Sequence, residues 1–183
     1  TNWSEKIESF SFSSNTVNSG FGTLVAKNIG STHSSTTHGF CAAGFWGTMA
    51  SPNTYSTIDK FSFASGGAVS GHGNLFGGHK TLAGGASSAT EGFQFGGQHI
   101  NSTAYLAEKF SFASDSNATY NADLFDGSEG GTGISSKTNG YMAGGEQAGY
   151  KVIQKYPFAS DDNSTDVGDL LGTQANSAGG AQY

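Results

Sequence analysis

The chain has 183 residues and a net charge of −6, and all eight of its basic residues are lysine. An acidic chain without arginine is a poor candidate for binding nucleic acid, whose phosphates and guanines are contacted preferentially by arginine. The same charge argues against an anionic membrane surface, and no apolar run is long enough for a membrane span. The single cysteine, Cys41, has no second cysteine in this sequence with which to form a disulfide, and its neighbours favour a small buried side chain over a reactive thiol.

The composition predicts an all-β chain. Glycine is abundant, with 29 residues, but the sequence also holds 14 Phe, 7 Tyr and 2 Trp. Disordered chains are poor in aromatic residues, so the aromatic content argues for a packed core. Aromatic residues spaced among glycine, serine and threonine are typical of short strands joined by tight turns.

A Phe-x-Phe motif and its variants occur four times along the chain. The leading aromatic residues are separated by 51, 49 and 46 residues, and they are Phe10, Phe61, Phe110 and Tyr156. A repeat of this length indicates one supersecondary unit copied in tandem. We therefore expect one repeat domain over residues 1–183, with approximate units 1–54, 55–104, 105–149 and 150–183.

Each unit contains four segments that we predict to be strands. One is a glycine and an aromatic residue followed by a small pair, as in Gly92-Phe93 with Gly96-Gly97. The second segment holds the Phe-x-Phe motif, and the fourth is rich in glycine. The third segment contains a leucine in every unit: Leu24, Leu75, Leu124 and Leu170. Four short strands in each repeat of this length are typical of a β-propeller blade.

Strand periodicity places both rings of each Phe-x-Phe motif on one face of the sheet. We expect these rings to fill the space between stacked sheets, where each buried ring contributes about 1.5–3 kcal/mol to stability. We also expect the small pairs to lie on an innermost strand, where converging sheets leave least room for side chains.

The repeat resembles the kelch-type β-propeller repeat, in which a Gly-Gly pair is followed by a tyrosine and then by a second aromatic residue. Gly96-Gly97, Tyr105 and Phe110 match this pattern, as do Gly144-Gly145, Tyr150 and Tyr156. The first unit departs from it with Ala43-Gly44, and phenylalanine replaces the family's usual tryptophan at the last position. The resemblance implies a β-propeller of about four four-stranded blades.

A second resemblance concerns the C-terminal unit. The stretch 155–161, Lys-Tyr-Pro-Phe-Ala-Ser-Asp, with 163–170 after it, looks like repeat proteins of tailed bacteriophages that are often described as tail or virion components. This similarity implies a virion or extracellular location, with other assembly subunits as partners. Loops rich in serine, threonine, asparagine and glycine suit contact with cell-surface glycans, through hydroxyl hydrogen bonds and aromatic stacking.

The two termini are expected to meet in one blade. Residues 169–181 align without gaps on residues 74–86, which makes the chain one strand short of a fourth complete blade. In the alternative alignment, Gly179-Gly180 are the inner strand itself, and the distance of 13 residues from Gly180 across the termini to Phe10 equals that from Gly97 to Phe110. A slice of a larger propeller is the competing interpretation of the whole chain.

No pattern in the sequence predicts a catalytic or transition-metal site, and we expect neither an enzyme nor a bound cofactor. The five histidines lie at no metal-binding spacing, and we expect His72 and His79 to lie in Gly-rich loops, satisfying turns or facing solvent. Four oxygen-bearing residues after Phe-x-Phe strands are candidates for Ca²⁺: Asp115, Asn117, Asp161 and Asn163. The same residue types build β-turns, and this explanation is favoured because Gly66-Gly67 take the equivalent place in another unit.

The largest departure from the repeat is the insertion at residues 48–54, next to Phe45 and Trp46. We expect these two residues, with Tyr55, to lie at one rim and contact a partner. The favoured function is therefore a non-enzymatic structural or adhesive protein of a virion or extracellular assembly. The alternatives are a stand-alone lectin-like propeller and, less favoured, a propeller enzyme.

Overall fold

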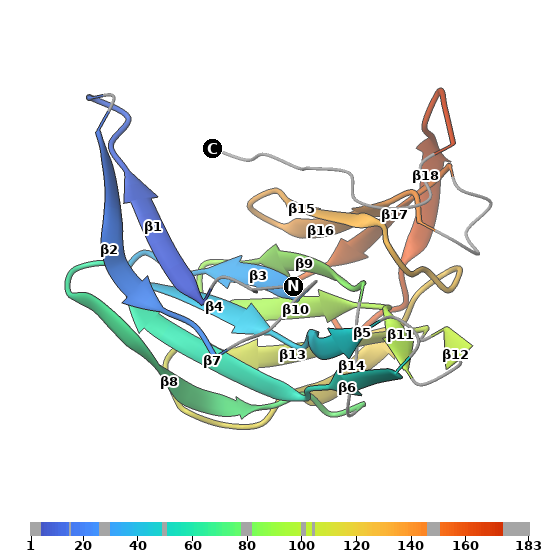
Figure 1. The fold of residues 1–183 in the computed structure, drawn as a ribbon. Helices are drawn as coiled ribbons and strands as arrows, with labels where there is room; N and C mark the ends of the chain where they lie inside the picture. The colour runs from blue at the N-terminus through green and yellow to red at the C-terminus, as the bar shows by residue number, and fades with distance from the viewer. Residues whose placement is uncertain are drawn as a thin grey trace.

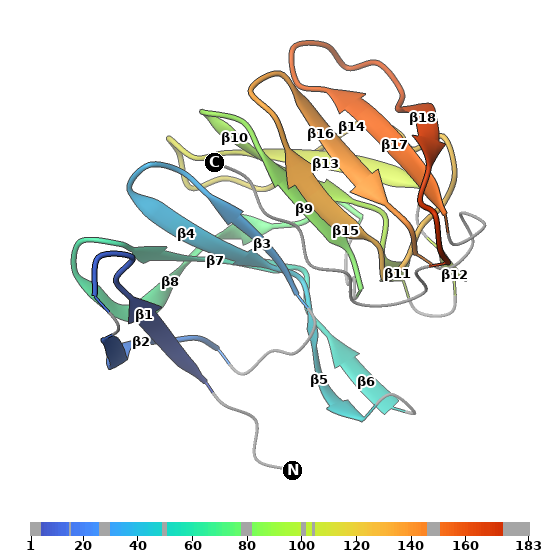
Figure 2. The ribbon, with the colours of Figure 1, turned by 90° about the horizontal axis from the view of Figure 1, so that it is seen from above.

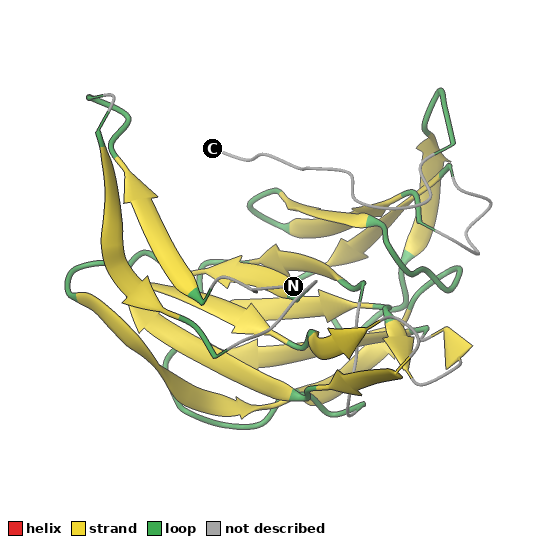
Figure 3. Ribbon diagram, in the orientation of Figure 1, coloured by secondary structure: helices red, strands yellow, loops and turns green. Residues whose placement is uncertain are grey.

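The protein is an all-β chain in the part that the computed structural model describes. Described are residues 5–14, 16–25, 30–48, 51–77, 82–99, 102–103, 105–145 and 151–173. Within these ranges there are eighteen strands, of which fourteen form three sheets of four to six strands (Figure 3). The predicted all-β class is confirmed. The described residues contain no helix with the length and apolar character of a membrane span.

The first sheet has six strands in the order β1-β2-β8-β7-β4-β3. Two of them form an N-terminal hairpin, β1 (Lys6–Phe10) and β2 (Val17–Thr23). The other four form an antiparallel meander, which we call unit A: β3 (Ser31–Ser34), β4 (His38–Ala42), β7 (Thr57–Ser62) and β8 (Gly66–Asn74). The hairpin joins unit A through a short parallel pairing between β2 and β8.

The other two sheets repeat the meander of unit A. Unit B consists of β9 (Gly84–Ser87), β10 (Glu91–Phe95), β13 (Leu106–Ser111) and β14 (Thr119–Asp123). Unit C consists of β15 (Thr132–Ser135), β16 (Asn139–Ala143), β17 (Val152–Pro157) and β18 (Thr165–Asp169). Each sheet thus takes its first two strands from one sequence repeat and its last two from the next.

Two short hairpins extend the connections between the second and third strands. In unit A the hairpin is β5 (Phe45–Thr48) with β6 (Ser51–Thr54), and in unit B it is β11 (Gln98–His99) with β12 (Ser102–Thr103). The β5–β6 hairpin projects away from the four-stranded sheets (Figure 2). The insertion in the repeat therefore forms an element of its own.

Units A, B and C lie side by side in chain order (Figures 1 and 2). Their first strands approach one another, because β9 contacts both β3 and β15. Glycine permits this approach at Gly133, where a Cβ atom would overlap the backbone of Gly85. Crowding between sheets thus explains the Gly-rich segment of the repeat.

The hydrophobic core lies between the units rather than within them. One buried cluster joins units A and B, and it contains Phe40, Ala42, Ala43, Ile58, Leu75, Phe110 and Ala118. A second joins units B and C, and it contains Ala86, Phe93, Phe95, Ala107, Ala122, Leu124, Met142 and Tyr156. A four-stranded meander of this size buries its apolar residues only against a neighbour, as expected for a repeat architecture.

The prediction that the Phe-x-Phe rings pack between neighbouring sheets is confirmed in units B and C. Phe110 is 2% exposed, and the half-buried Phe112 stacks on Phe40 of unit A with ring centroids 4.7 Å apart and an interplanar angle of 17°. In the same way, Phe158 stacks on Phe93 at 4.5 Å and 23°.

The first copy of the motif differs. Phe10 is 67% exposed and Phe12 is 99% exposed, because no described sheet covers the hairpin on that side. The expectation that all eight rings are buried is wrong for these two and for Phe63, which is 43% exposed. The two rings contact each other edge to face, with centroids 5.4 Å apart.

The small pairs have a second cause besides the one that the sequence suggested. They follow the second strand of each unit, and their backbones are left-handed; at Gly96 and Gly97, for example, φ is 57° and 93°. Ala43, at φ 62°, is the one member of these pairs that is not glycine. Because L side chains are strained in this region, backbone conformation gives a reason for these pairs that the sequence did not suggest. Crowding acts as well at Gly145, where a Cβ atom would overlap Ser128 Oγ.

Replacing Phe110 by alanine should lower the free energy of unfolding by about 3–5 kcal/mol, because it removes a fully buried ring from the A–B core. Urea denaturation followed by tryptophan fluorescence or circular dichroism measures this change. The matched control is Phe12→Ala, at a ring that is 99% exposed. An equal and small effect of both substitutions would contradict this placement of the core.

Candidate functional site

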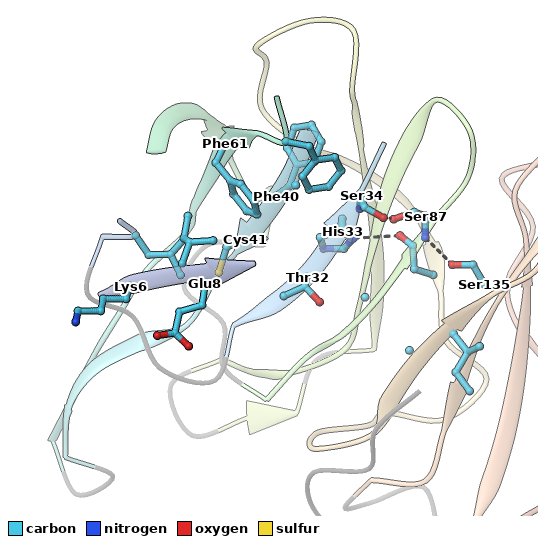
Figure 4. Close-up of a pocket in the computed structure, with 18 residues that line it drawn as sticks. Lys6, Glu8, Thr32, His33, Ser34, Phe40, Cys41, Phe61, Ser87 and Ser135 are labelled. Atoms are coloured by element: carbon cyan, nitrogen blue, oxygen red, sulfur yellow. Dashed lines mark hydrogen bonds between the residues drawn. The ribbon is translucent and has the colours of Figure 1, made fainter. Parts of the chain in front are cut away.

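A cavity of about 550 Å³ opens between the N-terminal hairpin and the three units. One wall is strand β1, at Lys6, Ile7 and Glu8, and a second wall is unit A. The third wall consists of residues 85–87 and 133–135, on the first strands of units B and C. Figure 4 shows Glu8 on β1 on the same side of the opening as Cys41, with the serines of the first strands beyond.

Strand β1 forms an open edge along this cavity. The equivalent strands β7, β13 and β17 each pair with a strand on both sides. In the described part of the chain, β1 pairs only with β2. An edge strand has one row of backbone donors and acceptors facing away from its sheet, which another extended segment can use.

Phe61 and Phe63 line the cavity on the side of unit A. They occupy the positions that Phe110 and Phe112 occupy in unit B, but Phe63 is 43% exposed. No described ring from another sheet covers them, and their ring contact is with each other at 5.8 Å. The apolar wall of the cavity is therefore an inter-sheet surface that no described sheet covers.

His33 forms the junction between units A and B at the cavity. It is 4% exposed; its Nδ1 donates to the Ala86 carbonyl at 3.1 Å, and its Nε2 lies 3.0 Å from Ser31 Oγ. Burial lowers the pKa of His33 to about 4, against the opposing effect of its hydrogen bonds. The imidazole is therefore neutral at pH 7, and its nitrogens bind the fold rather than a ligand.

A chain of serines continues along the third wall. The Ser34 amide donates to Ser87 Oγ at 3.0 Å, and the Ser87 amide donates to Ser135 Oγ at 2.7 Å (Figure 4). The same kind of hydrogen bond, from a backbone amide to a serine hydroxyl, thus joins the first strands of all three units at equivalent positions.

Cys41 lies at the cavity and is partly exposed, so the prediction of a small buried residue holds only in part. His72 differs more from its prediction, because it is 3% exposed rather than in a solvated turn. It contacts Asp115 at 3.0 Å and the Ser111 carbonyl at 2.8 Å, between units A and B. His79 lies outside the described residues.

The predicted partner contacts lie on and directly after the β5–β6 hairpin. Phe45 and Trp46 lie in β5, where Trp46 pairs with Asn53, and the structure describes the backbone of this hairpin but not its side chains. Tyr55 follows the hairpin, is partly exposed, and donates its amide to the Gly44 carbonyl at 2.8 Å. These residues are brought to one projecting element, and their role stays a prediction.

The four calcium candidates join consecutive units. Lys60 contacts Asp115 at 2.5 Å and Lys109 contacts Asp161 at 2.9 Å. These lysines hold the pKa of both exposed carboxyls below the ordinary value. Asn117 and Asn163 each accept a backbone amide of the preceding unit at 3.0 Å. Within the described ranges no group of three or more His, Cys, Asp or Glu side chains is placed to hold a metal.

The sequence did not reveal the cavity, although it holds one signal for it. The lysine before the Phe-x-Phe motif, found at positions 60, 109 and 155, is replaced by Ser9 in the first copy. The aspartate that pairs with it in units B and C is replaced by Gly66 in unit A. Both halves of the ion pair are thus missing where the hairpin meets unit A, which marks this junction as different.

No protein-family model matches this chain, and no curated protein shows significant similarity to it.

His33 makes stability depend on pH above the range in which carboxyl groups titrate. Its pKa is about 4 in the fold and near 6.5 when the chain unfolds, so the unfolded chain binds the extra proton between these values. The free energy of unfolding should therefore be highest above pH 6.5 and fall by up to about 3 kcal/mol as the pH drops toward 4.

Urea denaturation at a series of pH values measures this slope, and His33→Gln should flatten it. The lowered pKa values of Asp115 and Asp161 act in a separate window, because their contribution is lost only below the ordinary carboxyl value. Equal slopes for the two proteins between pH 4 and 6.5 would contradict the burial of a neutral imidazole.

Proposed function

We propose that this chain is a kelch-like β-propeller of about four blades that acts as a non-enzymatic structural or adhesive part of a virion or extracellular assembly. Its partners are other subunits of that assembly and glycans of a cell surface. The proposal combines the two sequence resemblances with the way in which consecutive units join.

Three features support the propeller arrangement. Units A, B and C have the same strand order, and their first strands lie side by side. The backbone contact between Asp123 and Ser164 at 3.0 Å recurs between Asn74 and Ala118 at 2.8 Å. The pairing of Thr23 with Ala68 is the equivalent contact between the hairpin and unit A. The hairpin therefore lies on unit A as the outer half of a preceding blade would lie.

The observation that carries the structural role is the use of the polar side chains. Residues that could do chemistry in a pocket instead hold the loop of the neighbouring unit. The buried Glu108 carboxylate accepts the amides of Phe76 and Gly77 at 2.7 and 3.1 Å. The buried Gln154 binds the backbone of Asp126 through both ends of its amide, at 3.0 and 2.9 Å. These side chains hold consecutive units in fixed positions, and loops carried on a rigid sheet scaffold suit recognition.

The β5–β6 hairpin is the proposed contact element, with Phe45, Trp46 and the adjoining Tyr55. It projects from unit A (Figure 2), and tryptophan and tyrosine supply large amphipathic surfaces to protein and glycan interfaces.

Trp46→Ala should weaken assembly or glycan binding about tenfold while leaving the urea denaturation curve unchanged. Native mass spectrometry measures assembly, and a glycan array measures sugar binding. Phe125→Ala is the matched control, since Phe125 is 59% exposed on another unit. Unchanged assembly and unchanged glycan binding in Trp46→Ala would contradict the proposed contact. Glycan binding by a strictly monomeric protein would favour the lectin over the assembly part.

A further inference from the structure

The other units define which strand belongs beside β1. In all three, a second strand pairs with the Phe-x-Phe strand in one register, with glycine opposite the leading aromatic residue. The pairs are Gly39 with Phe61, Gly92 with Phe110, and Gly140 with Tyr156. Transferred to β1, this register puts a glycine opposite Phe10 and an aromatic residue opposite Ser9.

The glycine in this register has a steric reason. A Cβ atom at Gly92 would overlap the ring of Phe110, and one at Gly39 would overlap the ring of Phe61. The leading aromatic side chain lies across the neighbouring strand, so that strand needs a residue without a side chain there. A strand that pairs with β1 beside Phe10 meets the same requirement.

The aromatic residue after that glycine also has a ring on which it can stack. Phe40 and Phe93, which follow their glycines, stack on the second Phe-x-Phe ring of the next unit at 4.7 and 4.5 Å. The equivalent ring beyond the hairpin is Phe63, which is 43% exposed and lines the cavity. The cavity thus lies between β1, with which such a strand would pair, and the Phe63 ring, which its aromatic residue would cover.

The neighbouring position disfavours an acidic residue. The residues opposite Asp59, Glu108 and Gln154 are Cys41, Gln94 and Met142. The fourth residue of this series is Glu8, on the cavity wall. A carboxylate opposite it would meet like charge, which is destabilising for directly opposed residues.

From this geometry we propose that β1 and the adjoining cavity accept an extended segment of a partner subunit, with the pattern glycine, aromatic residue, non-acidic residue. The segment adds a strand to β1 and stacks its aromatic ring on Phe63, a mode of recognition in which backbone hydrogen bonds give affinity and side-chain pockets give specificity. This inference rests on the proposed assembly role and names the kind of partner. Residues 174–183 of this chain contain no glycine followed by an aromatic residue, so a peptide of these residues serves as a control in the test.

The probe is a fluorescein-labelled peptide of residues 88–97, Ser-Ala-Thr-Glu-Gly-Phe-Gln-Phe-Gly-Gly, titrated with the full chain and followed by fluorescence anisotropy. We expect saturable one-to-one binding. Changing Phe93→Ala in the peptide should weaken it about tenfold, since a stacked aromatic pair is lost. Changing Gly92→Val in the peptide should abolish binding. Phe63→Ala in the protein should weaken binding to the same degree as Phe93→Ala in the peptide. Phe125→Ala, at an exposed ring of unit B outside the cavity, should leave it unchanged.

The peptide variants keep the test valid if a substitution in the protein disturbs folding. Absence of saturable binding, or binding that neither Gly92→Val nor Phe93→Ala alters, would overturn the proposal. Equal binding by a peptide of residues 174–183 would also overturn it, because the groove would then belong to the chain's own tail. If the intact protein assembles through Trp46 but the peptide does not bind, this inference fails and the proposed function stands.

Discussion

The structure depends on a flat contact between aromatic rings of consecutive units. Phe40 stacks on Phe112, and Phe93 stacks on Phe158. Each contact runs from the second strand of one unit to the residue directly after the third strand of the next. A four-stranded meander has two faces and too few residues to bury either face alone. The ring stack covers the face of one unit with the face of the next, so stability is a property of neighbouring pairs rather than of single units.

Polar contacts fix the position of one unit on the next around this stack. An ion pair, an asparagine bound to a backbone amide, and a buried side chain that holds a loop recur at equivalent places between units A and B and between B and C. Exposed ion pairs contribute little to the free energy of folding, so their role here is to fix the position of one unit on the next. At the junction of the hairpin and unit A, Ser9 and Gly66 replace the ion pair, and the cavity opens at this junction.

The sequence predicted what depends on local pattern. Aromatic residues with period two identified the third strand of each unit, and the repeat length predicted four short strands. It did not predict which rings are buried, because Phe10 and Phe110 stand in equivalent positions and differ only in the sheet that covers them. It missed the burial of His72 for the same reason, since its partners Asp115 and Ser111 belong to the next unit. The backbone at Gly96-Gly97 was misread, because a left-handed turn and a crowded strand both select glycine.

A double-mutant cycle on Phe93 and Phe158 tests the stack between units most directly. The free energies of unfolding of Phe93→Ala, Phe158→Ala and the double variant are measured by urea denaturation, with Phe93 and Phe125 as an uncoupled reference pair. Face-to-face packing of units B and C predicts a coupling energy of about 0.5–1.5 kcal/mol for the stacked pair and none for the reference. Additive effects at Phe93 and Phe158 would show that these units do not pack through their rings.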